Sequence, residues 1–119
     1  MPTVSLKGID SNPTLLADSL TRGTDEGKPV KFSDNLTVAL CSDGDDFVGI
    51  VEAIDPDNAV CVVRDHGYVT VPYTGSAPSV GYGILSANGA GGVKTDSAGR
   101  SYYIGNVDTV NATVTFKLE

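Results

Sequence analysis

The residues best suited to catalysis are few, and they are scattered along the sequence. His66 is the only histidine among the 119 residues, and it stands in the segment RDHGY between two strand-like runs. A nucleophilic triad needs a histidine beside a serine or cysteine in a context such as a G-x-S-x-G elbow, and no such segment is present. The sequence therefore predicts no catalytic residues and a protein that is not an enzyme, with His66 as a solvated turn residue.

Residues that bind metals are present, but their spacing does not match a known metal site. Two acidic segments contain Asp43, Asp45, Asp46, Asp55 and Asp57. An EF-hand loop needs twelve positions ending in Glu, and that spacing is missing. Cys41 and Cys61 lack both the C-x-x-C spacing and the further ligands of a zinc site. We predict no metal and no cofactor, and two buried free thiols, with a disulfide between neighbouring strands as the alternative.

The glycine-rich segment GAGG at residues 89–92 invites comparison with a phosphate-binding loop. A P-loop continues into Lys-Ser or Lys-Thr and then a helix, and neither follows here. The segment therefore predicts a flexible hairpin tip.

Tyrosines are the remaining side chains that could bind a partner. They are Tyr68, Tyr73, Tyr82, Tyr102 and Tyr103. Aromatic rings on a β-surface stack on sugars or bases, and tyrosine is also enriched in protein interfaces. We predict an oligomer interface that contains Tyr68, Tyr73 and Tyr82, with a carbohydrate-binding or other adhesion module as the alternative.

The charge and the apolar pattern argue against two further classes of partner. Eight Lys and Arg against 15 Asp and Glu give a net charge of −7, which disfavours contact with phosphates. No apolar run approaches the roughly 20 residues of a membrane span. The N-terminus MPTVSLKGIDSNPTLL lacks the basic region and apolar core of a signal peptide. We expect no direct nucleic-acid or membrane partner, and folding in the cytoplasm where the chain is made.

The backbone pattern predicts an all-β protein. Fourteen residues are glycine, well above the average of roughly 7%, and most lie between apolar runs. From Pro29 onward apolar residues alternate with a period of two, most regularly in the closing segment that contains Val114, Phe116 and Leu118. We predict a small β-barrel or β-sandwich of about eight short strands as one domain over residues 29–119.

Residues 1–28 differ from the rest and are interpreted as an extended N-terminal arm. Thr3 to Leu6 alternate and could form a short strand at a sheet edge. The segment SNPTLLADSLTRG carries one helical signature, with Asn12 as N-cap, Pro13 at the first helical position and Gly23 as terminator. We therefore expect at most one short helix, and about ten residues would be marginal without packing.

Two segments echo each other: FVGIVEAIDPDNAVCVV and YYIGNVDTVNATVTFKL. Each runs from an aromatic residue and a glycine through an apolar strand and an acidic turn to Asn-Ala and a second apolar strand. We interpret them as two similar hairpins. Gly49 and Gly105 would suit a bulge or a sharp bend where a small barrel curls.

The segments GKPVKF, DDFVGIVEAID, RDHGYVTVPYTGSAPSVGYGIL, GAGGVKT and YYIGNVDTVNATVTFKL follow in this order over residues 28 to 118. Together they resemble the tailed-phage capsid decoration, or cement, family, whose members were once loosely labelled recombinases. The resemblance implies a virion protein that binds the outer surface of an icosahedral head and bridges capsomers, with another phage head or tail structural role as the alternative.

The same resemblance implies the partners and their sites. The partners would be the major capsid protein and two further copies of the chain in a homotrimer, located on the virion surface. The arm would order on the capsid, which makes five residues the candidate capsid-binding set: Thr3, Val4, Ser5, Leu6 and Ile9.

Overall fold

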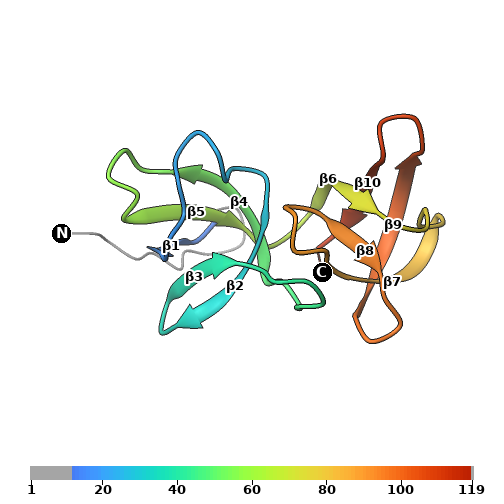
Figure 1. Ribbon diagram of the computed structural model, residues 1–119, viewed down its shortest axis with the longest axis horizontal. Coiled ribbons are helices and arrows are strands. Elements are labelled where there is room, and N and C mark those ends of the chain that lie inside the picture. The colour runs from blue at the N-terminus through green and yellow to red at the C-terminus, as the bar shows by residue number, and fades with distance from the viewer. Residues whose placement is uncertain (1–11, 119) are drawn as a thin grey trace.

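The computed structural model describes residues 12–118, and these residues form ten strands and no helix. The strands make two closed five-stranded barrels that lie end to end (Figure 1). The first barrel contains β1 (Thr14–Ala17), β2 (Pro29–Asp34), β3 (Thr37–Leu40), β4 (Gly49–Ile54) and β5 (Val60–Arg64). The second contains β6 (Tyr68–Thr74), β7 (Gly81–Ala87), β8 (Val93–Thr95), β9 (Arg100–Asp108) and β10 (Thr113–Lys117).

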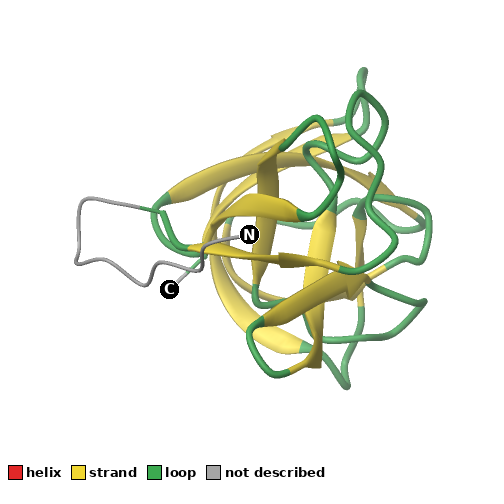
Figure 2. Ribbon diagram, turned by 90° about the vertical axis from the view of Figure 1, so that its left-hand side faces the viewer, coloured by secondary structure: helices red, strands yellow, loops and turns green. Residues whose placement is uncertain are grey.

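The two barrels have the same topology. The first runs β1-β3-β2-β4-β5 and closes back to β1, and the second runs β6-β8-β7-β9-β10 and closes back to β6. In each barrel the first and third strands are parallel and every other pair is antiparallel. Because order and direction match strand by strand, the second barrel repeats the architecture of the first. Figure 2 shows the strands curving around the barrel interior, with the connections outside.

The two echoing segments are the fourth and fifth strands of each barrel, so they occupy equivalent places. Asp55 and Asp108 stand at the two turns, and each carboxylate accepts hydrogen bonds from two backbone amides that follow it, those of Ala59 and Val60 and those of Val110 and Asn111. Three residues earlier in each hairpin one residue has no partner in the opposite strand, namely Glu52 in β4 and Gly105 in β9. The sequence echo therefore marks a structural repeat, and the expected bulge at Gly105 is confirmed.

Gly49 has a different role from the one expected. It pairs with Val30 at the start of β4 and lies outside the bulge of that strand. A Cβ atom at Gly49 would lie 2.3 Å from the carbonyl oxygen of Arg64 and 2.7 Å from Cγ1 of Val63. Glycine is required here because the neighbouring backbone approaches too closely for a side chain.

Each barrel encloses an apolar cluster. The cluster of the first barrel is Leu15, Leu20, Val30, Val38, Val51, Ile54, Cys61 and Val63. The cluster of the second is Val69, Val71, Tyr73, Leu85, Ala87, Val93, Tyr102, Ile104, Val114, Phe116 and Leu118, joined by Phe47 and Ile50 from the first barrel's part of the chain. The predicted inward set Val114, Phe116 and Leu118 is thus confirmed as core.

The described residues contain no helix, in agreement with the expectation of at most one, and the segment with the helical signature instead contains strand β1 at Thr14–Ala17. This strand pairs with both β3 and β5 and closes the first barrel. Leu15 and Leu20 are each 2% exposed in the barrel core. A helix of this length has little stability of its own, so pairing and burial outweigh the local capping signature.

The division of the chain also differs from the predicted arm and single domain. Residues 12–28 belong to the first barrel. In the sequence, the first barrel ends with β5 and the second begins with β6. The all-β barrel class is confirmed. The strands number ten in the described residues because β1 lies in the predicted arm and β8, with only three residues, lies in a segment read as turns.

Candidate interaction surface

A row of three tyrosines and a lysine crosses the outside of the second barrel. Tyr82 in β7 lies opposite Tyr103 in β9, Tyr103 lies opposite Lys117 in β10, and Lys117 lies opposite Tyr68 in β6. Side chains alternate between the two faces of a strand, so these four residues share the outer face. The adjacent core residues Val69, Tyr102, Ile104, Phe116 and Leu118 point inward. We call Tyr68, Tyr82, Tyr103 and Lys117 the tyrosine row.

The aromatic side chains of the row are exposed. Tyr82 is 82% exposed, Tyr68 50% and Tyr103 47%. The rings of Tyr82 and Tyr103 contact each other with centroids 5.0 Å apart and planes tilted by 58°. The row borders a depression of about 340 Å³ whose lining also includes Arg100 and Ser101. Tyrosine and arginine are the residue types enriched in protein interfaces.

The charge of this surface is opposite to that of the chain as a whole. Four lysine or arginine side chains form ion pairs with carboxylates, and they are Lys28, Lys31, Arg64 and Lys94. Within the described residues Arg100 and Lys117 form no such pair, and no carboxylate lines the depression. A protein with a net charge of −7 therefore presents a small basic and aromatic surface here.

The other two tyrosines lie inside the second barrel. Tyr73 is 9% exposed and belongs to the core cluster, so it is not part of the surface that holds Tyr68 and Tyr82. Tyr102 is 3% exposed and stacks on Phe47, with ring centroids 5.2 Å apart. Burial raises the pKa of the Tyr102 hydroxyl. The guanidinium of Arg100 lies over the Tyr102 ring, 5.4 Å from its centroid.

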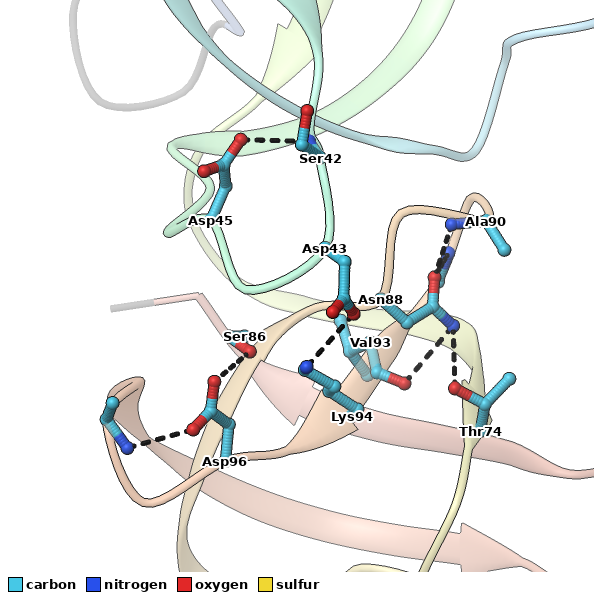
Figure 3. A network of polar contacts seen from close by, with 12 residues as sticks. Ser42, Asp43, Asp45, Thr74, Ser86, Asn88, Ala90, Val93, Lys94 and Asp96 are labelled. Carbon is cyan, nitrogen blue, oxygen red and sulfur yellow. Dashed lines mark hydrogen bonds and ion pairs between the residues drawn. The ribbon is translucent and has the colours of Figure 1, made fainter.

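The barrels are joined by the β3–β4 loop, residues 41–48 (Figure 3). The Gly44 amide donates to the backbone carbonyl of Ala87 at 2.8 Å, and the Ala87 amide donates to the backbone carbonyl of Asp45 at 2.9 Å. Asp43 forms an ion pair with Lys94 at 2.9 Å. Together these contacts hold the acidic loop of the first barrel against β7 and β8 of the second.

Two of the acidic residues named from the sequence are thus held by lysines. Asp45 accepts hydrogen bonds from Lys31 and from the Ser42 amide, and these bonds lower the pKa of its carboxyl. The hydrogen bond and charge of Asp43 raise the pKa of Lys94. In residues 12–118 no group of three or more His, Cys, Asp or Glu is arranged to hold a metal ion.

The glycine-rich turn 89–92 also belongs to the barrel junction. Asn88 Oδ1 accepts hydrogen bonds from the amides of Ala90 and Gly92, and Asn88 Nδ2 donates to Thr74 (Figure 3). A Cβ atom at Gly89 would lie 2.8 Å from the Asp43 amide nitrogen. The turn connects the antiparallel strands β7 and β8, so the predicted hairpin tip is confirmed, and it is held by Asn88 and packs on the first barrel.

The remaining candidate residues lie apart from the tyrosine row or outside the described chain. His66 Nδ1 lies 2.8 Å from a carboxylate oxygen of its neighbour Asp65. Cys41 and Cys61 are free, and burial raises the pKa of each thiol to about 11. The candidate capsid-binding residues lie outside the described residues, and they are Thr3, Val4, Ser5, Leu6 and Ile9.

Sequence reasoning identified Tyr68 and Tyr82 but did not place Tyr103 and Lys117 beside them. Alternation along YYIG indicates that one of two adjacent tyrosines faces outward. The strand register is a tertiary property, and it aligns β7, β9, β10 and β6. This alignment shows that Tyr103, and not Tyr102, is the tyrosine that faces outward.

Comparison with known proteins gives no relative: no family model and no curated protein matches the chain. Within residues 12–118 there is no helix long and apolar enough to cross a membrane.

Proposed function

We propose that this protein is a structural component of a phage virion that binds the outside of the head and stabilises it by bridging capsomers. The observation that carries the proposal is the exposed tyrosine row on a rigid barrel. Exposed aromatic side chains beside the cations Arg100 and Lys117 are suited to a contact with another protein chain, which includes a further copy of this one. The resemblance of residues 28 to 118 to the capsid decoration family supports the major capsid protein as the partner.

The tandem barrels suit such a role physically. A decoration protein needs a soluble, stable body that presents more than one surface, and two barrels joined end to end provide separate surfaces (Figure 1). Weak contacts repeated over a shell reinforce one another through effective concentration. We therefore propose a non-enzymatic, homotrimeric protein of the capsid surface.

Co-sedimentation with expanded empty heads tests this function. The wild-type protein should sediment with the heads, and Tyr82→Ser should reduce the bound fraction, because the tyrosine row joins copies whose contacts with the shell reinforce one another. Val110→Ser is the matched control, because Val110 is 91% exposed in the β9–β10 turn and is not part of the tyrosine row. Failure of the wild-type protein to bind, while a known decoration protein binds the same heads, would overturn the proposal.

A second experiment concerns the N-terminal residues. Removing residues 1–11 leaves Asn12, whose side chain donates to Glu52 at 2.7 Å, in the shortened chain. The shortened protein should keep its melting temperature and bind heads more weakly. Unchanged binding would remove these residues from the mechanism.

Carbohydrate binding is the alternative function that the tyrosine row favours. The tilt of 58° between the rings of Tyr82 and Tyr103 places the edge of one ring toward the face of the other, which gives no flat platform for a sugar. The geometry therefore supports a protein partner better. A glycan array in which Tyr82→Ser abolishes a specific signal would reverse this order.

A further inference from the structure

The first barrel contains a row of residues equivalent to the tyrosine row. Pro29 in β2 lies opposite Ile50 in β4, and Ile50 lies opposite Arg64 in β5. These strands correspond to β7, β9 and β10, where Tyr82, Tyr103 and Lys117 are aligned in the same way. The shared bulge and turn of the two hairpins give the same alignment, so the two rows are structurally equivalent.

Two members of this row, Pro29 and Ile50, are buried under the second barrel, while the side chain of Arg64 is 40% exposed at its margin. Ile50 is 5% exposed and belongs to the apolar cluster of the second barrel. Ile50 and Arg64 border a groove with residues 68–70 at the start of β6, and Pro29 lines a cavity with the β7–β8 turn. The second barrel therefore uses the start of its first strand and its β7–β8 turn to cover this row.

Within residues 12–118 no further barrel covers the tyrosine row. The positions equivalent to the buried Pro29 and Ile50 thus present two aromatic rings, those of Tyr82 and Tyr103, to solvent in the second barrel. Large apolar groups gathered at a site that is an interface in the equivalent barrel indicate an interface here too.

The first barrel presents the matching surface. Its β2–β3 hairpin is the equivalent of β7–β8, and it carries Phe32 at 49% and Leu36 at 42% exposure, with the exposed carboxylate of Asp34 between them. We call Phe32, Asp34 and Leu36 the hairpin tip. It lies toward the opposite end of the molecule from β7 and β9 (Figure 1). Its apolar and acidic character complements the aromatic and basic character of the tyrosine row and Arg100.

We propose that the tyrosine row of one copy binds the hairpin tip of a second copy, which repeats between chains the contact made within the chain. The two surfaces differ, so the contact is heterologous, and the copies form a ring or an open chain according to the rotation between them. A closed ring of three would be the homotrimer of the proposed function. The contact itself depends on these surfaces alone and not on capsid binding.

Complementation between two variants of the full chain tests the proposal by analytical ultracentrifugation. The row variant is Tyr82→Ser with Tyr103→Ser, and the tip variant is Phe32→Ser with Leu36→Asn. Asparagine suits position 36 because Leu36 has a positive φ of 51°. Unchanged far-UV circular dichroism and melting temperature establish that each variant is folded. If either double variant is not folded, the single variants Tyr82→Ser and Phe32→Ser replace the row variant and the tip variant.

The wild-type chain should self-associate with rising concentration. The dissociation constant of self-association should be at least about tenfold higher for each variant alone. An equimolar mixture should regain one contact per pair and stop at heterodimers, because only one intact row and one intact tip remain. Three outcomes would overturn the proposal: a wild-type chain that stays monomeric at its highest soluble concentration, a variant that associates like the wild type, and a mixture that stays monomeric. Association without binding to heads supports this contact and removes the capsid proposal.

Discussion

The two barrels share one topology but fill their interiors with different residues. The first contains only aliphatic side chains and one cysteine, and all of them come from its own part of the chain, residues 12–64. The second is built around Phe116, Tyr102 and Tyr73, and it also includes Phe47 and Ile50 from the first barrel's sequence. The comparison indicates that the second barrel needs the first to complete its core.

The dependence of one barrel on the other has a clear structural cause. The β3–β4 loop leaves the first barrel and places Phe47 against Tyr102 and Phe116, at centroid distances of 5.2 and 5.9 Å. Aromatic pairs at such distances stabilise beyond their buried area. Two barrels of the same fold can thus become a single cooperative unit when one barrel contributes a side chain to the core of the other.

Replacing Phe47 should have the largest effect. Phe47→Ala leaves a cavity between two aromatic rings and should lower the free energy of unfolding by about 3–5 kcal/mol. All five tyrosines lie in β6 to β9 and the chain has no tryptophan, so tyrosine fluorescence reports on the second barrel alone. In urea the fluorescence midpoint should fall below the far-UV circular dichroism midpoint.

The matched control for Phe47 is Phe32→Ala in β2, where the ring is 49% exposed. This change should cost less than about 0.5 kcal/mol. Equal losses for the two phenylalanines, or coincident midpoints for Phe47→Ala, would contradict the dependence of the second barrel on the first.

The two glycines of the equivalent hairpins should differ next most strongly. Gly49→Ala forces a methyl group against the Arg64 carbonyl and should destabilise the protein by about 1–3 kcal/mol. Gly105→Ala makes only ordinary contacts, with Tyr68 Cε1 at 3.5 Å and the Thr115 carbonyl oxygen at 4.0 Å, and should stay within about 0.5 kcal/mol of the wild type. Thermal melting followed by circular dichroism measures both, and a larger loss at Gly105 would refute the assignment of close approach to Gly49.

Acid should weaken the fold through carboxylates whose pKa is lowered. Hydrogen bonds from the Asn111 side chain and amide lower the pKa of Asp108, and the Ala98 amide and the Ser86 hydroxyl lower that of Asp96. An aspartate whose pKa is lower in the folded than in the unfolded state stabilises the fold. This stabilisation is complete when the pH is above the ordinary aspartate pKa of 3.8, and it is lost as the pH falls through the lowered pKa of the folded state. The melting temperature should therefore decline below about pH 4.

Asp108→Asn keeps an oxygen acceptor in the turn but removes the titration. Its melting temperature should fall less between neutral pH and pH 3 than that of the wild type. An identical decline in both proteins would show that Asp108 does not contribute to acid sensitivity.

The junction ion pair should give the smallest effect. Asp43 is 66% exposed and Lys94 30%, and exposed pairs contribute little because water and salt screen them. Lys94→Met should cost less than about 1 kcal/mol at low salt, and the loss should shrink in high salt. Lys117→Met is the control, since Lys117 forms no ion pair in the described residues. A loss at Lys94 that does not depend on salt would assign its role to packing instead.

Part of the fold could be predicted because local patterns carry it. The period of two from Pro29 onward predicted strands, and the Asp-x-x-Asn-Ala turns predicted two similar hairpins. Strand β1 could not be predicted, because the capping signature from Asn12 to Gly23 is stronger locally than its strand pattern. Only pairing with β3 and β5 makes it a strand.

The tyrosine row, like the fold, could be predicted from the sequence only in part. The residue type alone indicated Tyr68 and Tyr82 as interface candidates, but it also indicated Tyr73. The side chain of Tyr73 lies in the core, because side chains alternate between the two faces of β6. Nor could the residue type show that Lys117, distant in sequence from Tyr82, lies in the same row. Sequence distance carries no information on register between strands joined around a closed barrel.

The sequence by itself determined that this is an all-β, acidic protein with a repeated hairpin, because alternation, turn residues and charge are local properties. The tertiary structure decided that the hairpins belong to two barrels, that Phe47 belongs to the core of the second, and that one tyrosine row is left uncovered. These features depend on which strands close a barrel and which barrel faces the other, and such contacts join residues far apart in the chain.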